Sequence, residues 1–481
     1  MRQKGHCMST TPAALTRGPS LPARSPRRRR HHLVVGAALA ASGLFSTYLG
    51  AVRPTATYAS VPRNGAECTS QATTGLQLSE ALRTATDGDV VCMANDIALI
   101  SGTRLEVFNT SVTIDGRGHR LSWPNAQRGI VVNLTSQTVN QVAIANIEFS
   151  DQRVGTRGAI SVDAASNAAP ADSLTLSNLS FSRLDQSTIP VTSTWVGGAI
   201  FAQGLRTVSM SNVVMRDNQW QAGGGAFVTA DRISLADSSF TGNASYSDID
   251  DPSVTGSCDP DPFSGFPEGP SGAAAMFNAR ESVTITGTIM WNNSAECDGG
   301  ALWLSGRTTV GENPSVVNIS DSSFAYNSAR NGSGGGISAN RLREMTLTGT
   351  GVLANDAAVT GGGIDARDVT GVFVQSSGVS YNTAGVEFTS QGASDGGGIH
   401  AYTPVSDSVL SVTESLLTNN TADYSGGAVF ASVGRTRIFD SQVMSNRART
   451  GDGGGIYALE PDAGGEADVP SVSVQGTTIS G

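Results

Sequence analysis

Apolar and polar residues alternate in many short stretches of this chain, as in SVTIDG (111–116), SLTLSN (173–178) and EMTLTG (344–349). Strict alternation over such short runs is typical of strands with one buried face. The second inward position of the pattern recurs along the chain at Ile114, Ile144, Leu176, Met210, Leu235, Ile285, Ile319, Leu347, Val374, Val412, Ile438 and Val474. The pattern therefore predicts an all-β protein built from many copies of one short strand.

A second pattern, Gly-Gly-(Gly/Ala)-apolar, recurs in step with these strands. Its copies are Gly197–Ile200, Gly224–Phe227, Gly299–Leu302, Gly334–Ile337, Gly361–Ile364, Gly396–Ile399, Gly426–Val429 and Gly453–Ile456, and a degenerate copy ends at Met276. Glycine permits backbone angles that other residues avoid, so we expect each copy to form a tight corner that enters a strand. A phosphate-binding role would need a strand–loop–helix context, and no helical pattern follows the glycines.

A third pattern is an apolar residue followed three positions later by Asn. It occurs at Phe240–Asn243, Phe324–Asn327, Val352–Asn355, Val379–Asn382, Leu417–Asn420 and Val443–Asn446. Asparagines at equivalent turns of stacked parallel strands can form amide ladders. The shortest spacing between glycine motifs, 26 or 27 residues, matches one coil of a parallel β-helix with two or three short strands. Because one coil cannot bury its apolar face alone, the sequence predicts a single-stranded solenoid of about twelve coils.

The ends of the predicted solenoid need separate treatment, because open parallel coils expose unpaired backbone. We assign residues 60–106 to an N-terminal cap, in which Leu76, Leu78, Ala81 and Leu82 have roughly helical spacing and predict a short capping helix. Residues 107–481 form the predicted β-helix. The chain stops at Gly481 just after a new coil begins, which we interpret as an incomplete C-terminus.

Residues 1–59 have the pattern of a secretory signal. A basic run, Arg27–Arg30, precedes the uncharged apolar run 33–52 and an acceptable small-residue cleavage site ending at Ala59. The apolar run is about as long as a membrane span, so an uncleaved N-terminal anchor is the alternative. We expect an exported monomer, extracellular or at the cell surface, that contacts the membrane only through this segment.

Charge and cysteine usage agree with export. The first 59 residues carry nine Lys/Arg and no acid, which leaves 22 basic and 41 acidic residues beyond them. An acidic body argues against a nucleic-acid partner. Beyond the leader stand four cysteines, an even number that indicates disulfides in an exported chain. Of three pairings we favour Cys68–Cys92 and Cys258–Cys297, because each encloses one local segment.

An acidic insertion between residues 246 and 270 holds the candidate metal ligands. These are Asp248, Asp250, Asp251, Asp259 and Asp261. Closely spaced carboxylates among turn residues can supply oxygen ligands to calcium. The spacing lacks the rest of a calcium-loop signature, so a solvated acidic loop is the favoured interpretation and calcium the alternative. No other cofactor is implied.

The tandem motifs resemble the repeats of the polymorphic outer-membrane protein family, whose hallmark is GGA(I/L/V) together with FxxN. FxxN is intact at Phe240–Asn243 and Phe324–Asn327, and aliphatic residues replace Phe in the other copies. More broadly, the chain is similar to right-handed parallel β-helix proteins. The resemblance covers roughly Ala199 to the C-terminus and implies an exported surface protein or adhesin.

The strand after each glycine motif should point alternate side chains away from the core. With Ile399 and Ala401 inward, the expected outward column is Phe201, Val228, Phe277, Trp303, Ser338, Asp365, His400, Phe430 and Tyr457. Arg367 and Tyr402 belong to the neighbouring outward column. We expect Asp365, Arg367, His400 and Tyr402 to cluster in the middle coils, flanked by Trp303, Asn340 and Tyr457.

Three functions are consistent with this outward face. The favoured one is contact with an extracellular glycan or with a surface protein of a host or neighbouring cell, in which aromatic side chains stack on the ligand. The alternative is a polysaccharide lyase or hydrolase that uses Asp365 and His400 as an acid–base pair with Arg367. Only Asp365 supplies a carboxylate here, which favours binding over catalysis. The third is a structural spacer.

Overall fold

The computed structural model describes residues 67–123, 129–135, 139–154, 158–164, 172–186, 197–220, 223–246, 258, 270–306, 315–385, 394–459 and 471–481. Of two compact units, Met1–Val61 and Pro62–Gly481, only the second contains described residues. The expected leader and the five candidate calcium ligands lie outside these ranges. Within them, no helix is long and apolar enough to cross a membrane.

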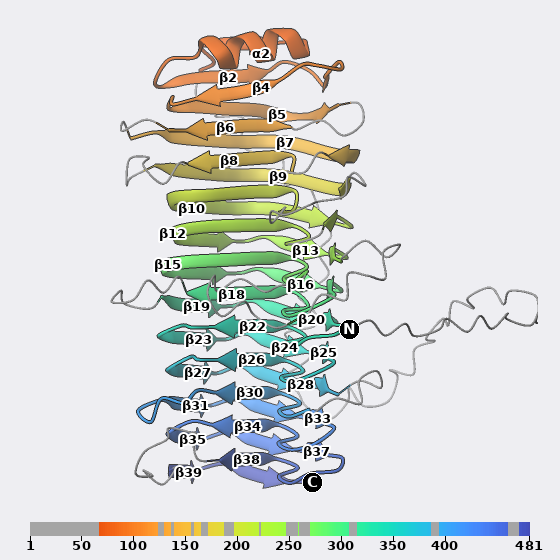
Figure 1. Cartoon of the computed structure of the whole chain (residues 1–481), viewed down its shortest axis with the longest axis vertical. Coiled ribbons are helices and arrows are strands. Elements are labelled where there is room, and N and C mark those ends of the chain that lie inside the picture. Colours follow the sequence, from red (N-terminus) through yellow and green to blue (C-terminus); the bar gives the residue numbers. More distant parts are fainter. Residues whose placement is uncertain are drawn as a thin grey trace, which may run out of the picture. The chain divides into compact units, whose positions relative to one another are not determined.

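The glycine-entered strands form one continuous parallel stack (Figure 1). Twelve strands pair successively, which confirms the expected number of coils. They are β4 (Leu105–Phe108), β6 (Ile130–Leu134), β8 (Ile160–Ala164), β10 (Ile200–Arg216), β12 (Ala226–Ala236), β15 (Ala275–Thr286), β18 (Leu302–Gly306), β22 (Ile337–Asn340), β26 (Ile364–Arg367), β30 (Ile399–Tyr402), β34 (Val429–Ser432) and β38 (Ile456–Leu459).

A second stack carries the alternating strands found in the sequence. Its members are β2 (Asp89–Met93), β5 (Val112–Ser122), β7 (Gln141–Val154), β9 (Ser173–Gln186), the later parts of β10, β12 and β15, then β19 (Val316–Ser320), β23 (Glu344–Thr348), β27 (Gly371–Gln375), β31 (Val409–Thr413), β35 (Arg435–Phe439) and β39 (Ser471–Gln475). At the N-terminal end, β1 (Ser70–Ala72) pairs with β2, and β3 (Ile97–Ala98) pairs with β5. Because β2 pairs in parallel with β5 and β4 pairs in parallel with β6, the stacking begins upstream of residue 107.

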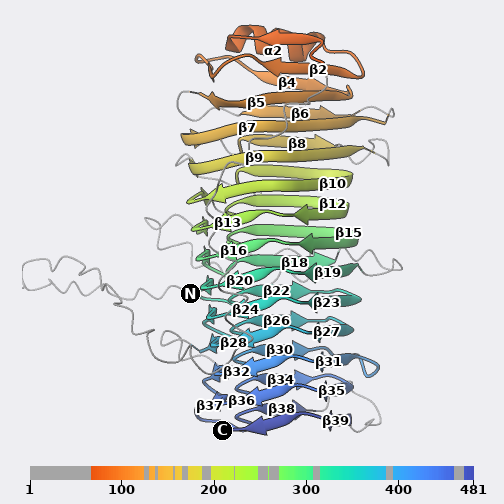
Figure 2. The ribbon, with the colours of Figure 1, turned by 180° about the vertical axis from the view of Figure 1, so that it is seen from behind.

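Two further stacks complete each C-terminal coil, which has four strand segments instead of the expected two or three (Figure 2). The third stack follows β10 with β13 (Ser239–Thr241), β16 (Ile289–Trp291), β20 (Ser323–Ala325), β24 (Gly351–Leu353), β28 (Gly378–Ser380), β32 (Leu416–Thr418), β36 (Gln442–Met444) and β40 (Thr478–Ser480). The fourth contains the two-residue strands β11 (Gln219–Trp220), β14 (Ala244–Ser245), β17 (Ser294–Ala295), β21 (Ser328–Ala329), β25 (Asp356–Ala357), β29 (Thr383–Ala384), β33 (Thr421–Ala422) and β37 (Arg447–Ala448).

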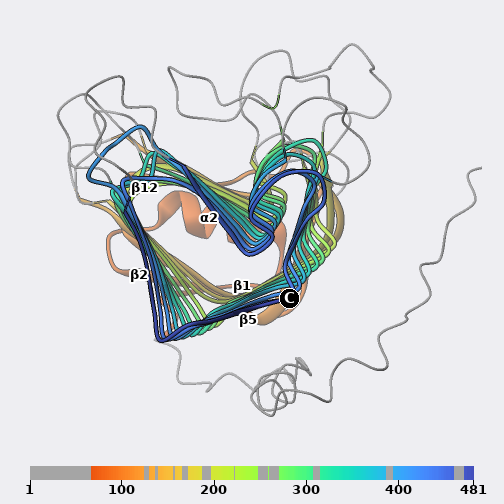
Figure 3. The same ribbon diagram turned by 90° about the horizontal axis from the view of Figure 1, so that it is seen from below.

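The core follows directly from the alternating pattern. Each of the twelve predicted inward positions, from Ile114 to Val474, pairs with the next in register. All are buried except Val474, on the last coil. Viewed along the stack, the straight segments of successive coils superpose at shared corners (Figure 3). The chain therefore is the expected all-β, right-handed parallel β-helix.

One helix, α2 (Gly75–Thr84), lies across the first coil, as the spacing of its leucines predicts (Figures 1 and 3). The Thr74 hydroxyl caps its N-terminus by accepting a hydrogen bond from the Gln77 amide, a contact worth about 1 kcal/mol. Leu78 and Leu82 pack into the core, whereas Leu76 is exposed, contrary to its expected place on the buried face. The predicted Cys68–Cys92 disulfide joins this cap to β2.

The glycines form corners as expected, but the first and second glycine of each motif are required for different reasons. The first glycine has a positive φ in each of the six copies from Gly299 to Gly453, between 61° and 69°, a region that glycine occupies without steric cost. The second is required by space, because a Cβ at Gly397 would clash with the carbonyl groups of Thr421 and Gly427. Gly397 therefore lets adjacent coils approach closely at the corner.

The expected amide ladder is present and longer than the sequence motif indicates. In each step the side-chain Nδ2 and backbone N of one asparagine donate to Oδ1 of the asparagine in the next coil, at 2.9–3.2 Å. It runs through Asn218, Asn243, Asn293, Asn327, Asn355, Asn382, Asn420 and Asn446. Asn218 and Asn293 also stand three positions after an apolar residue, Met215 and Met290, but were not among the predicted copies.

Candidate functional site

The candidate site lies where the glycine corners meet the outward column of the first stack. The residue immediately before the corner glycine is polar in seven successive coils, and we call this set the pre-glycine column: Ser271, Asp298, Ser333, Thr360, Asp395, Ser425 and Asp452. Backbone amides in this column donate to side chains of the preceding coil, as from Ser333 N to Asp298 Oδ1 at 2.7 Å and from Ser425 N to Asp395 Oδ1 at 2.9 Å. Sequence reasoning missed these residues, although a polar residue precedes six of the eight glycine motifs.

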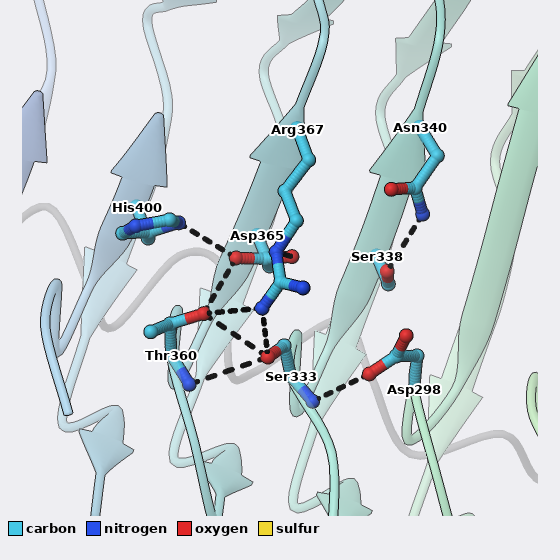
Figure 4. A network of polar contacts seen from close by, with 8 residues as sticks. All are labelled: Asp298, Ser333, Ser338, Asn340, Thr360, Asp365, Arg367 and His400. Atoms are coloured by element: carbon cyan, nitrogen blue, oxygen red, sulfur yellow. Dashed lines mark hydrogen bonds and ion pairs between the residues drawn. The ribbon is translucent and has the colours of Figure 1, made fainter. Parts of the chain in front are cut away.

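Asp365 stands at the centre of a polar network that joins three coils (Figure 4). Its Oδ1 faces His400 Nδ1 at 2.7 Å and accepts from the Thr360 hydroxyl at 2.8 Å, while its Oδ2 faces Arg367 Nε at 3.0 Å. Arg367 Nη2 also donates to Ser333 Oγ at 2.7 Å and to Thr360 Oγ1 at 3.1 Å. Both carboxylate oxygens are thus engaged, and the guanidinium ties Asp365 to the pre-glycine column.

The surroundings of Asp365 stabilise its ionised form. Burial by itself raises the pKa of this carboxyl, which is 1% exposed, but the charge of Arg367 and the hydrogen bonds from His400 and Thr360 outweigh burial and hold the pKa below its usual range. An ionised carboxylate can only accept, so His400 donates through Nδ1. Asp365 is therefore an ionised carboxylate whose charge is balanced by Arg367, and it holds both His400 and Arg367 in place.

His400 is held on its other side by an aromatic ring. Its imidazole stacks on Phe430 with ring centroids 5.1 Å apart, and Phe430 contacts Tyr457 at 5.7 Å. Asp395, in the pre-glycine column, interacts electrostatically with this imidazole. Burial raises the pKa of Asp395, and the hydrogen bond from the Ser425 amide and the charge of His400 offset only part of that increase. Stacking and hydrogen bonding together fix the orientation of the imidazole.

The structure brings Asp365, Arg367, His400 and Tyr402 together, as the register of β26 and β30 pairs Asp365 with His400 and Arg367 with Tyr402. Tyr402 is 38% exposed and Arg367 is partly exposed, whereas His400 and Asn340 are buried. Asn340 lies one coil before Arg367 and donates to Ser338 Oγ at 3.4 Å. We call the outward side of β26 and β30 the Arg367–Tyr402 face.

Trp303 does not contribute an exposed ring, and the expectation that it would is wrong. It is fully buried and packs in an outward cluster with Phe201, Phe227 and Met276. The prediction that Val228 and Phe277 point outward is also wrong, because both side chains belong to the core. The register predicted from the motif GGAF was off by one residue. Gly223 forms that corner, so Ala226 pairs with Ile200 and Phe227 points outward.

The metal hypothesis is not tested by the described residues. The candidate ligands Asp248, Asp250, Asp251, Asp259 and Asp261 lie outside them, and the part of the chain that the structure describes contains no cluster of three or more His, Cys, Asp or Glu able to hold an ion. The predicted disulfide Cys258–Cys297 is confirmed, with the two Cα atoms 5.2 Å apart. It fixes residue 258 to the corner that precedes Asp298.

Replacing Asp365 by asparagine is expected to destabilise the coils containing β22, β26 and β30 by about 3 kcal/mol, because Arg367 loses its countercharge next to buried groups. Since the folded pKa of Asp365 lies below its unfolded value, its stabilising contribution is complete above the ordinary aspartate pKa and is lost as the pH falls through the lowered value. Hydrogen exchange of these strands as a function of pH measures both effects. Equal acid sensitivity in Asp365→Asn and the parent would contradict them.

These features define the class: an all-β, right-handed parallel β-helix with an amide ladder and two disulfides. The model of the Chlamydia polymorphic membrane protein (Chlamydia_PMP) repeat matches residues 414–432. That segment contains one ladder asparagine, Asn420, and one glycine motif, Gly426–Val429. The chain is thus a parallel β-helix in which residues 414–432 are similar to the polymorphic membrane protein repeat.

Two other comparisons add little to this assignment. No curated protein matches the chain. A solved structure, the A-module of mannuronan C-5 epimerase AlgE6 from Azotobacter vinelandii, is 11% identical, and the alignment covers 85% of this chain and 95% of that one with a TM-score of 0.39.

Proposed function

We propose that the chain is an exported, adhesin-like β-helix module that acts at the cell surface or outside the cell. In this proposal it binds an extracellular glycan or a protein of another cell surface through the Arg367–Tyr402 face, without catalysing a reaction. The repeat match at 414–432 supports surface association. The two disulfides support export.

The observation that favours binding over catalysis is the state of Asp365. A general acid or base must reach the substrate and exchange a proton with it, yet this carboxylate is buried and both its oxygens are engaged by residues of its own network. Tyr402, beside it, presents a large exposed ring. Exposed aromatic rings supply apolar contact area with a polar edge and are common at binding surfaces.

A binding assay with the purified chain on arrays of extracellular polysaccharides and on intact cells tests this proposal. Tyr402→Ala is expected to weaken binding about tenfold, the effect of losing one well-packed aromatic contact. The matched control is Val405→Ala, an exposed apolar residue three positions beyond Tyr402 in the loop that follows β30. Absence of binding, or equal loss in both variants, would contradict the proposal and favour a structural spacer.

The rival function, polysaccharide cleavage, rests on the 2.7 Å contact between Asp365 and His400. Incubation with uronic-acid and neutral polysaccharides, followed by detection of new reducing ends or unsaturated products, tests it. Turnover that disappears in Asp365→Asn would replace the binding proposal with an enzyme. We expect no product from any polysaccharide.

A further inference from the structure

A different surface of the solenoid carries exposed aromatic rings in a position where the backbone disfavours them. The residue before each ladder asparagine has a positive φ, and we call the C-terminal part of this set the turn column: Asn292 (53°), Tyr326 (57°), Ala354 (52°), Tyr381 (58°), Asn419 (55°) and Ser445 (55°). Each turns the chain from the third stack into the amide ladder. The conformation is a requirement of the coil and is present whatever residue occupies the position.

Tyrosine is a poor choice for this conformation. Glycine, Asn and Asp tolerate a positive φ, whereas a bulky side chain at such a φ is an outlier that carries strain. The backbone hydrogen bonds that fix the turn, from Tyr326 N to Leu353 O and from Tyr381 N to Thr418 O, both 3.0 Å, do not involve the ring. Asn292 and Asn419 show that the same turn forms with the favoured residue.

The two rings also do not stabilise the core. Tyr326 is 46% exposed and Tyr381 is 48% exposed. Backbone strain kept at an exposed, apolar side chain is the kind of outlier that points to function. Asparagine would fit either turn with less strain, and neither ring fills the core.

The rings form a row along the stack. Trp291, 39% exposed, contacts Tyr326 with ring centroids 4.6 Å apart. Tyr381 stands two coils beyond Tyr326, about 10 Å away at the usual spacing of parallel strands, and the small Ala354 lies between them. We call Trp291, Tyr326 and Tyr381 the aromatic row.

The two columns that carry the aromatic row are uncharged, whereas the exposed Asp356 stands two residues beyond Ala354 in the neighbouring fourth stack. The turn column from Asn292 to Ser445 contains amides, hydroxyls and one methyl side chain but no Asp, Glu, Lys or Arg. The same holds for the preceding column at the end of the third stack, Trp291, Ala325, Leu353, Ser380, Thr418 and Met444. A charged peptide or an acidic polymer would find no ionic partner in either column.

We propose that the aromatic row binds a linear neutral glycan laid along the stack of coils. Sugar rings present apolar C–H faces to aromatic rings and hydroxyls to neighbouring amides, which matches both halves of this surface. A polymer of repeating sugar units also suits aromatic rings placed one and two coils apart along the stack. This site is separate from the Arg367–Tyr402 face and goes beyond the function proposed for it.

The test uses the double variant Tyr326→Asn/Tyr381→Asn, which installs the residue found at Asn292 and Asn419. Binding of cello-, manno-, xylo- and chitohexaose is measured by calorimetry, with an oligogalacturonate as the anionic comparison. At least one neutral hexasaccharide is expected to bind the parent chain and to bind the double variant at least about tenfold more weakly. The Tm of the variant should equal or exceed that of the parent, because the strain is relieved.

Two further variants make the outcome specific. Tyr424→Ala removes an equally exposed tyrosine outside the turn column and is expected to leave the affinity unchanged. Tyr402→Ala alters only the Arg367–Tyr402 face, so retained hexasaccharide binding in that variant separates the two sites. Binding to none of the neutral hexasaccharides, preference for the oligogalacturonate, or unchanged affinity in the double variant would overturn the proposal.

Discussion

Gly397→Ala is expected to disrupt the coils that contain β26, β30 and β34, with a loss of more than about 4 kcal/mol of local stability. The added Cβ would clash with the Thr421 carbonyl group and the Gly427 oxygen, which belong to the backbone of the same and the next coil. Backbone cannot move aside as a flexible side chain can. Because coils interact mainly with their neighbours, hydrogen exchange of individual strands should show the loss near residue 397 and intact protection toward α2.

Gly351→Ala is the matched control for this result. Gly351 opens β24, has no atom within 4 Å of an added Cβ and lies outside the positive-φ region. Alanine there should change stability by less than about 1 kcal/mol, in the stabilising direction, since it restricts the unfolded chain. Comparable losses in the two variants would show that close backbone approach at the corner is not the cause.

The core could be predicted from the sequence because two independent periodicities coincide. Alternation with period two selects the inward residues of a strand, and the coil length then places equivalent residues on top of one another. All twelve positions from Ile114 to Val474 paired as expected for this reason. The amide ladder followed from the same reasoning, since an asparagine at a fixed place in each coil has its counterparts directly above and below.

The exposure of outward side chains was predicted less well, because it depends on how the side chains of neighbouring coils pack against them. Trp303 satisfied the outward pattern but is buried among Phe201, Phe227 and Met276. A run of three glycines, Gly223–Gly225, gave no sign of which one forms the corner, and a shift of one residue exchanges the two faces of a strand. The positive φ of Gly223 decides the register.

The juxtaposition of Asp365, Arg367, His400 and Tyr402 could be predicted from the sequence, whereas their contacts could not. Strand register placed Asp365 beside His400 and Arg367 beside Tyr402. The sequence did not reveal that Thr360 and Ser333 reach across from the corner to complete the network, because their roles depend on the rotamer of Arg367. Because of those contacts, Asp365 is an ion-paired carboxylate that positions His400 and Arg367, and not one half of an acid–base pair.

The amide ladder carries the second large expected effect. Asn293→Ala should destabilise the coils on either side by about 3 kcal/mol or more, because Asn243 N and Nδ2 lose their common acceptor and Phe240 O loses its donor in the core. Each buried group left without a partner costs about 1–3 kcal/mol. Asn327 Oδ1 keeps one donor only if the Asn293 backbone stays in place. Thermal unfolding with strand-resolved hydrogen exchange measures the loss.

The adjacent asparagine provides the control that separates the ladder from the turn. Asn292 is exposed and has a φ of 53°, so glycine, which adopts this angle without strain, should be tolerated there to within about 0.5 kcal/mol. Asn293 lies outside the positive-φ region, points into the core and bonds to both neighbouring coils. If Asn292→Gly and Asn293→Ala were equally harmful, the turn conformation would be the source of stability, and the amide ladder would be its consequence.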